Sequence, residues 1–276
     1  MTNTITQPTQ QLTFPSPSFT KRIKGMLAVD FYRLFHTPLF YIFLAIAAII
    51  PALVSMGNAD ETAQLFTNAW QIIAADSPLY VVTNMGQYAN MNMVFIFGGI
   101  MISIFIGHDY TSGYVKQLFT THAKKQDYLL SKTMIGAFSM MCMCGTYLIG
   151  GILSAAFTGL TFFNVNAGSL ICALLGKVIM SLGWASLYTF INIIFRRKFG
   201  ISITLCFIIG TGIPVIAAAS LVGNSPILNV FLYGSSVNAC LSANFFTVLT
   251  CLVVSAVWAA IYNLVGTWIL SKRDCY

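Results

Sequence analysis

The sequence predicts an all-α membrane protein: six transmembrane helices, an amphipathic surface helix before the first and a re-entrant helical region before the last. Hydrophobic residues make up 57% of the 276 residues and charged residues only 8%. A soluble domain of this length needs far more charge to cover its surface. Long apolar runs recur, and each reaches the roughly 18 residues that cross a hydrocarbon core of ~30 Å as a helix. Helices are the expected elements because they satisfy their own backbone hydrogen bonds in lipid.

The chain begins with a polar segment that we expect to be disordered. Residues 1–19 are rich in Thr, Gln, Ser and Pro and carry no charge. They lack the basic and apolar regions of a secretory signal peptide, and their composition is typical of a disordered tail. The remainder, 20–276, is expected to form a single transmembrane domain.

The segment 20–37 is predicted to be a helix that lies flat along the membrane surface. Ile23, Leu27 and Leu34 fall on one face at helical spacing, while Arg33 falls on another. A helix with one apolar and one basic face is typical of membrane–water interfaces.

Six apolar stretches then follow as predicted spans. The first starts directly after Pro38, and the others are bounded by charged or polar segments. The spans are expected at about 39–56, 88–107, 133–158, 169–195, 201–222 and 246–270.

The segment 223–245, between the last two spans, is unusual. It is too apolar for a free loop, and small and polar residues interrupt it at positions 233–236. Broken backbone survives at membrane depth only where protein or a wet cavity covers it. We therefore expect a re-entrant or interfacial helix pair here.

The basic residues predict the orientation of the chain. All lysines and arginines except Lys177 fall in four segments on one side of the predicted membrane: 21–33, 116–132, 196–198 and 272–273. Basic residues favour the cytoplasmic side, so both termini are expected inside the cell. The net charge of +7 is thus a topology signal. A nucleic-acid partner is not expected, since no basic stripe with interleaved aromatic residues lies outside these segments.

Sequence motifs for bond-making chemistry are absent, and no catalytic residue or metal ligand is predicted. Gly176 and Lys177 are followed by Val178 rather than by Ser or Thr, and no glycine stands at the spacing of a phosphate-binding loop. ATP hydrolysis would therefore have to reside on another chain. The histidines are expected at membrane edges with polar tips toward water, rather than on a metal.

Lys177 is the one basic residue inside a predicted span. An ionisable residue at membrane depth is by default a candidate functional residue, here in a substrate path. The alternative is that the fourth span starts later and that Lys177 snorkels to the outer headgroups. Both interpretations stay open from the sequence.

The segment 108–132 gathers lysines, aspartates and histidines between two uncharged spans. These charges could serve only as topological anchors. Anchoring does not explain the face that ends at His122 and contains the apolar positions Val115, Leu118 and Phe119, all at helical spacing. That face predicts a docking partner, either lipid headgroups or a separate protein.

This segment resembles the first cytoplasmic loop of ABC-2 type permeases, the membrane subunits of ATP-driven exporters. There, an acidic residue, a glycine after a short spacer and a basic residue before the third span are usual, as in Asp109, Gly113 and Lys132. The chain departs from the pattern at Asp109, where Glu is common, and at Tyr114, where Thr is common. The resemblance implies that the ATPase contact includes Asp109, Gly113, Val115, Leu118, Phe119 and Lys132.

The resemblance extends from residue 21 to the end of the chain. Asp30, Phe31, Tyr32 and Arg33, before the span led by Pro38, resemble the small permeases of peptide and lantibiotic export or self-immunity in Gram-positive bacteria. It implies a non-enzymatic permease subunit in a bacterial plasma membrane that moves an amphipathic or peptide-like compound outward. Its partners would be a second permease chain and a cytoplasmic P-loop ATPase that binds ATP and magnesium.

Two other classes of function remain. A secondary transporter or channel usually carries paired ionisable groups near the midplane or internal repeats, and neither is visible here. A membrane scaffold or sensor that transports nothing is the other alternative. A neighbouring gene for a P-loop ATPase without membrane spans would favour the exporter.

Overall fold

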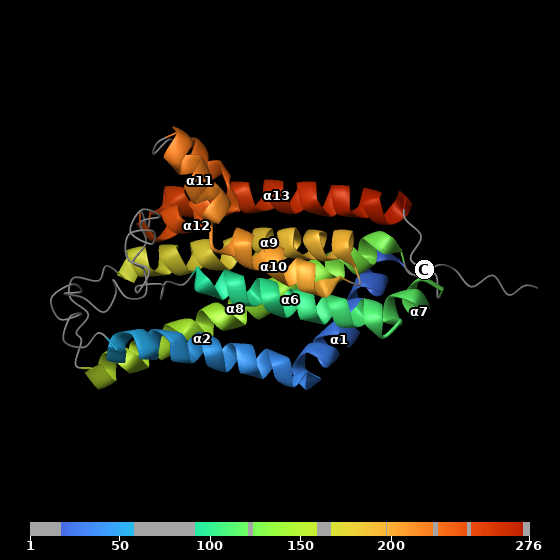
Figure 1. Cartoon of the computed structure of the whole chain (residues 1–276), viewed down its shortest axis with the longest axis horizontal. Coiled ribbons are helices and arrows are strands. Elements are labelled where there is room, and N and C mark those ends of the chain that lie inside the picture. The colour runs from blue at the N-terminus through green and yellow to red at the C-terminus, as the bar shows by residue number, and fades with distance from the viewer. Residues whose placement is uncertain are drawn as a thin grey trace, which may run out of the picture.

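The computed structural model describes residues 18–57, 92–120, 124–158, 167–196, 198–222, 226–241 and 244–272, and within these ranges it is helical with no strand. Figure 1 shows the long helices side by side in one bundle. The elements are α1 (Phe19–His36), α2 (Pro38–Gly57), α6 (Met93–Thr111), α7 (Tyr114–Thr120), α8 (Lys125–Thr158), α9 (Ala167–Phe195), α10 (Phe199–Gly210), α11 (Ile213–Val222), the 3-10 helix η2 (Pro226–Val230), α12 (Leu232–Leu241) and α13 (Phe245–Lys272). The predicted tail, 1–19, lies outside the described residues except for Ser18 and Phe19, where α1 starts.

Four of the described helices, α6, α8, α9 and α13, are long and apolar enough to cross a membrane, and the bent pair α1 and α2 would make a fifth span. They correspond to the predicted spans 88–107, 133–158, 169–195 and 246–270, and α2 corresponds to 39–56. The described part of the chain is therefore all-helical, with several apolar helices of membrane-crossing length.

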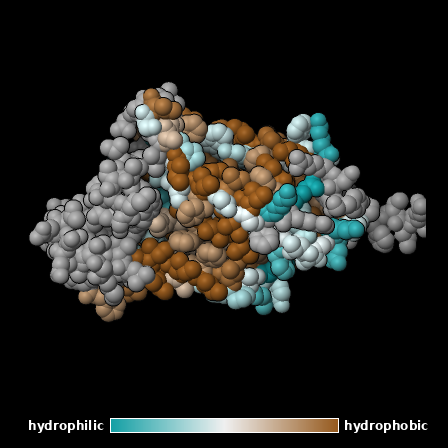
Figure 2. All heavy atoms as spheres, in the orientation of Figure 1, coloured by the Kyte–Doolittle hydropathy of each residue, from teal (hydrophilic) through white to brown (hydrophobic). Residues whose placement is uncertain are grey.

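The polar side chains gather at one end of the bundle. Figure 2 shows a broad hydrophobic surface over the middle of the bundle and hydrophilic side chains at the end where Figure 1 places α7 and the C-terminal end of α13. This end, formed by α1, α7, the first turns of α8 and the last turn of α13, is termed the charged end below.

A sharp bend separates α1 from α2. Thr37 between them has an extended backbone (φ −93°, ψ 117°), as expected for a residue before proline. The Thr37 hydroxyl donates to the Arg33 carbonyl oxygen at 2.6 Å, which satisfies one free carbonyl of the last turn of α1. The two helices meet at 66°, so α1 turns away from the direction of α2.

The fifth predicted span is not one continuous helix. The segment 201–222 is divided into α10 and α11 by Thr211 and Gly212, and in Figure 1 α11 projects from the side of the bundle. Gly212 has φ +74°, a conformation that costs other residues strain. A Cβ atom there would also lie 2.3 Å from the ring of Tyr233. The sequence 201–222 is apolar throughout, so its hydropathy gave no sign of the turn at Gly212.

Within the segment 223–245, the described residues include two short helices, η2 and α12, and the break between them lies elsewhere than predicted. The break falls near Phe231, between η2 and α12, and residues 233–236 lie inside α12. Gly234 and Ser235 tolerate a helix here because they pack closely: a Cβ atom on Gly234 would lie 2.1 Å from the Leu228 carbonyl oxygen. The prediction took these small residues for a helix break, whereas they permit close packing of two segments.

The centre of the bundle is α9, which packs against α6, α8 and α13. Its aromatic side chains fill the middle of the core: Trp184 stacks on Phe95 of α6 with ring centroids 5.5 Å apart. Tyr188 lies next to Trp184, at 5.4 Å between centroids. On the other side of the bundle, α2 packs along α8.

Candidate functional site

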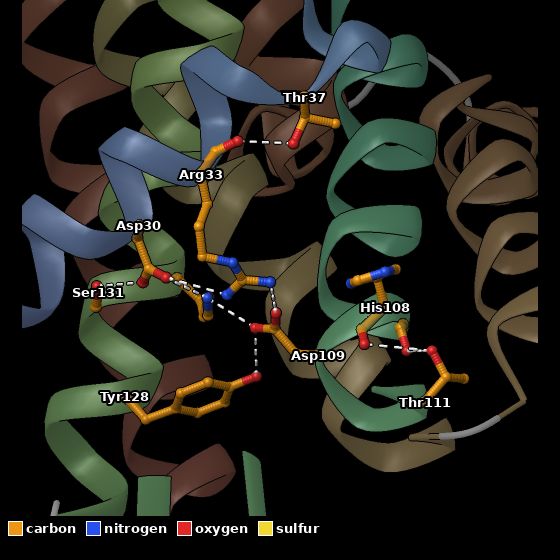
Figure 3. A network of polar contacts seen from close by, with 10 residues as sticks. Asp30, Arg33, Thr37, His108, Asp109, Thr111, Tyr128 and Ser131 are labelled. Atoms are coloured by element: carbon orange, nitrogen blue, oxygen red, sulfur yellow. Dashed lines mark hydrogen bonds and ion pairs between the residues drawn. The ribbon is translucent and has the colours of Figure 1, made fainter. Parts of the chain in front are cut away.

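The candidate site is a group of four charged side chains at the charged end, termed the charged junction: Asp30, Arg33, Asp109 and Lys132. Figure 3 shows Asp30 and Arg33 of α1 converging with Asp109 of α6. Lys132 belongs to a third helix, α8. Lys132 Nζ lies 2.6 Å from Asp30 Oδ1 and 2.7 Å from Asp109 Oδ2. The Arg33 guanidinium forms an ion pair with Asp109 and a longer contact of 3.6 Å with Asp30.

The charged junction is nearly closed to solvent. The side chains of Asp30, Asp109 and Lys132 are 2% exposed or less, whereas that of Arg33 is 23% exposed. Two carboxylates face two cations, so the formal charges cancel. Burying charges is costly unless each is paired and hydrogen-bonded, which explains why the group occurs as a closed network.

Neutral and aromatic side chains complete the network. Ser131 donates to Asp30 Oδ2 at 2.7 Å, and the Tyr128 hydroxyl donates to Asp109 Oδ2 at 3.3 Å. The Arg33 guanidinium lies over the ring of Tyr114, 4.4 Å from its centroid. These contacts give each carboxylate donors besides its cations, which is the condition for keeping such groups charged when buried.

A second set of contacts ties α1 and α13 to the start of α8. Arg22 donates to Asp127 Oδ2 at 2.7 Å, and Lys125 Nζ donates to the Leu270 carbonyl oxygen at 2.7 Å. The predicted third span, 133–158, therefore began too late: α8 starts at Lys125. The charges of its first turns are paired, so they do not end the helix.

The link between α6 and α7 is a tight turn. Gly113 has φ +76°, which glycine adopts without strain, and this allows α7 to fold back beside the charged junction. Val115 on α7 is buried, and Phe119 packs edge-on against Tyr128 with centroids 5.7 Å apart. The opposite face of α7, with Lys116, Gln117 and Thr120, is exposed.

The network perturbs two groups at this end. Burial opposes the charge of Arg33, but Asp109 and Asp30 outweigh it, so the pKa of the guanidinium is raised above its ordinary value. Burial and the nearby Asp30 carboxylate raise the pKa of the Tyr114 phenol, although Arg33 acts in the opposite direction. Arg33 therefore stays charged and Tyr114 stays neutral at neutral pH.

The structure places the six residues expected at an ATPase contact in two groups. Asp109, Lys132 and Val115 are buried within the chain, so any part they play in such a contact is indirect. Gly113, Leu118 and Phe119 are partly exposed. The apolar face of α7 was expected to bind a partner. In the structure it packs largely against the chain itself, through Val115 and Phe119. His122, at the end of the predicted apolar face, lies outside the described residues.

The sequence did not reveal that Asp30 and Arg33 join this site. From the sequence, both residues were assigned only to the surface helix 20–37 and to the segment 30–33 that resembles small permeases. A signal existed, because Asp30 is a lone acid in a helix whose other charged residues are basic. Such a residue on an amphipathic helix needs a cation, and Lys132 lies 102 positions further along the chain, beyond the reach of local patterns.

Lys177 lies far from the charged junction, inside the bundle. It is fully buried, its amino group donates to Asn92 Oδ1, and it lies 5.9 Å from the centroid of the Phe95 ring. Snorkelling along a lipid-facing surface is therefore the wrong interpretation. The side chain points between α6 and α9.

Among the residues described, no group of three or more His, Cys, Asp or Glu side chains could hold a metal ion. The chain matches no protein-family model and no curated protein.

Proposed function

We propose that the chain is the membrane subunit of an ATP-driven exporter and that a separate ATPase docks on the exposed face of α7. The observation that carries this proposal is the charged junction. It joins the surface helix α1 to the ends of two long helices, and α7 lies against it through Tyr114. A force on α7 therefore reaches both α6 and α8 through buried, paired charges.

The mechanism follows from the discrete nature of these contacts. Buried ion pairs with short distances have few alternative arrangements, so helices joined by them move as units or exchange partners in steps. When two ATPase subunits close on ATP, α7 would be displaced, and α6 and α8 would move with it. The chain itself makes and breaks no covalent bond.

The exporter requires the charged end to face the cytoplasm. The basic residues of its helices support this orientation, among them Arg22 and Arg33 on α1, Lys132 on α8 and Lys272 on α13. In it α1 lies along the inner membrane surface, which its 66° bend from α2 supports. The proposed topology has six spans with both termini inside: α2, α6, α8, α9, the pair α10 and α11, and α13. Segment η2 with α12 re-enters from the outer side.

The proposed unit contains two such chains and two ATPase subunits in a bacterial plasma membrane. Its substrate would be an amphipathic or peptide-like compound, because the apolar outer surface of the chain can contact such a compound as it contacts lipid. ATP and magnesium would bind to the ATPase alone.

The test uses two exposed residues at the charged end. Gln117→Trp places a bulky ring on the outward face of α7, and Ser271→Trp places the same ring at the end of α13. Tagged chains are purified from native membranes in mild detergent, and the ATPase recovered with each is measured. We expect ATPase with the unchanged chain and with Ser271→Trp, but at least roughly tenfold less with Gln117→Trp, because a misfit at the centre of a contact removes about 1–3 kcal/mol.

Purification of the unchanged chain without any ATPase would contradict the proposal and favour a secondary transporter, a channel or a scaffold. Equal recovery with Gln117→Trp would show that α7 is not the docking helix.

A further inference from the structure

A second group of buried polar side chains runs through the middle of the bundle along one face of α9. Its members recur at intervals of three or four residues, which places them in one stripe of the helix. They are Lys177, Ser181, Trp184, Tyr188 and Asn192, and all are buried.

Helices α6 and α10 cover this stripe with small and polar residues of their own. These are Asn92 at the N-cap of α6, Gly99 and Ser103 on α6, and Ser202, Cys206 and Gly210 on α10, each at helical spacing. The stripe of α9 and these covering residues are together termed the polar seam.

Hydrogen bonds and close packing connect the three helices within the polar seam. Asn192 Nδ2 donates to Ser103 Oγ at 3.0 Å, and Ser103 Oγ lies 3.4 Å from Cys206 Sγ. Tyr188 lies between two glycines: a Cβ atom on Gly99 or on Gly210 would come within 2.9 Å of it. The seam is closed in this conformation, since the glycines let the helices meet around the Tyr188 ring.

Several polar atoms of the seam retain unused hydrogen-bonding capacity. Within the described part of the chain, Trp184 Nε1, Tyr188 Oη, Asn192 Oδ1 and Ser202 Oγ are buried and have no hydrogen-bond partner. Their residues are at most 1% exposed. Buried polar groups in proteins are almost always satisfied, and the penalty for an unsatisfied one is largest in surroundings of low polarity. Four such atoms in one seam indicate a place for hydrogen-bonding molecules rather than a purely structural core.

Lys177 gives one end of the seam a positive charge. Its amino group donates a hydrogen bond to the neutral amide of Asn92. The described aspartates, Asp30, Asp109 and Asp127, belong to the charged end. The stretch of α9 from Lys177 to that end spans roughly 25 Å at 1.5 Å per residue. Among the described residues, no carboxylate lies near the Lys177 ammonium group. A buried cation between membrane helices favours an anionic partner, so we expect the seam to accept a ligand that carries an anionic oxygen.

We propose that the polar seam is the closed form of a hydrated path that takes solutes with an anionic oxygen group, a carboxylate or a phosphate, with Lys177 as the attracting charge. The wall that opens is α10. It ends at the turn of Gly212 rather than continuing into α11, so it can tilt from α6 and α9 without moving a full span. The assignment of the seam as the route of the exported compound rests on the proposed function. The hydration of the seam and its charge preference can be measured without an ATPase.

Two native cysteines supply a matched test. Cys206 lies in the polar seam, whereas Cys144 lies on α8 outside it, and they are 0% and 3% exposed. Two variants keep one of these cysteines each, with the other six replaced by alanine. Purified full-length protein in lipid nanodiscs is treated with an anionic sulfonatoethyl or a cationic trimethylammonium methanethiosulfonate, and modification is followed by intact mass. The cysteine thiolate attacks the sulfenyl sulfur of these reagents, which forms a mixed disulfide and releases methanesulfinate, and the thiolate forms only where water reaches the sulfur.

We expect Cys206 to react at least about tenfold faster than Cys144, since only the seam admits water. Relative to the rate of each reagent with a small thiol in water, we also expect the anionic reagent to react with Cys206 about tenfold faster than the cationic one, because Lys177 attracts one and repels the other. Lys177→Gln should remove this preference, and Lys177→Arg should keep it. The Arg variant also guards against misfolding, since it retains the charge.

Equal protection of Cys206 and Cys144 would overturn the hydrated path. A charge preference that is absent, or unchanged in Lys177→Gln, would overturn the anion selectivity. An unreactive Cys206 in a chain that still brings down an ATPase would refute the seam alone. A reactive Cys206 in a chain without an ATPase would support the seam and refute the exporter.

Discussion

Replacing Asp109 by asparagine is expected to lower the thermal unfolding midpoint of the purified protein by roughly 10 °C. The amide keeps the shape of the side chain but removes a charge that faces Lys132 at 2.7 Å and also pairs with Arg33. The charged junction would then hold two cations and one carboxylate in a buried site. Breaking a buried pair in this way costs about 3–5 kcal/mol, and each kcal/mol shifts the midpoint by about 2–4 °C in a chain of 150–250 residues. The fraction that remains monodisperse after heating in detergent measures the shift.

Two further variants distinguish charge balance from simple loss of a contact. Asp109→Asn combined with Lys132→Met restores neutrality and should recover much of the lost stability. Asp127→Asn should cost less than Asp109→Asn, because its partner Arg22 is 18% exposed and can turn its charge to water. If the double variant were less stable than Asp109→Asn alone, neutrality would not be what stabilises the charged junction.

The Gly150→Ala substitution is expected to be the second most destabilising change. Gly150 lies on α8 against α2, and a Cβ atom there would lie 2.1 Å from the backbone oxygen of Ala48. A backbone atom cannot rotate away as a side chain can, so the two helices must separate and lose contacts along their length. Overpacking of this kind costs about 1–3 kcal/mol, which corresponds to a fall of roughly 5 °C in the same heating assay.

Gly145 on the same helix provides the matched control, because a Cβ atom there would meet nothing within 4 Å. Gly145→Ala should leave the midpoint unchanged or raise it slightly, since alanine favours a helix over glycine by about 1 kcal/mol. Equal losses in the two variants would mean that α8 responds to lost glycine flexibility rather than to contact with α2.

The long helices were predictable from the sequence because membrane-crossing length and hydrophobicity are local properties. The predicted end of the fourth span, 195, is the last residue of α9, and the first span differs from α2 by one residue at each end. The turn at Gly212 was not predictable, because glycine also occurs inside helices. A Cβ atom at this position would also meet the ring of Tyr233 from another segment, which no local pattern reveals.

The charged junction was only half predictable. Asp109 and Lys132 could be identified because they bracket a loop that resembles one in a known family. Their burial could not, because it depends on Asp30 and Arg33 of a helix about 80 to 100 positions away. A hydropathy scale assigns each charged residue separately to the exposed surface. Two carboxylates and two cations that pair with one another can nevertheless be buried as a group.

If a separate ATPase moves this chain through α7, the hydrogen exchange of α7 should respond to nucleotide. This exchange is measured in native membranes. The backbone amides of Tyr114–Thr120 are followed by mass spectrometry without nucleotide and with ATP, magnesium and vanadate. Docking covers the exposed face of α7, and trapping the closed ATPase should change the exchange of this peptide by at least roughly threefold. The far end of α8 serves as a reference. Exchange of α7 that is the same with and without trapped nucleotide would contradict the claim.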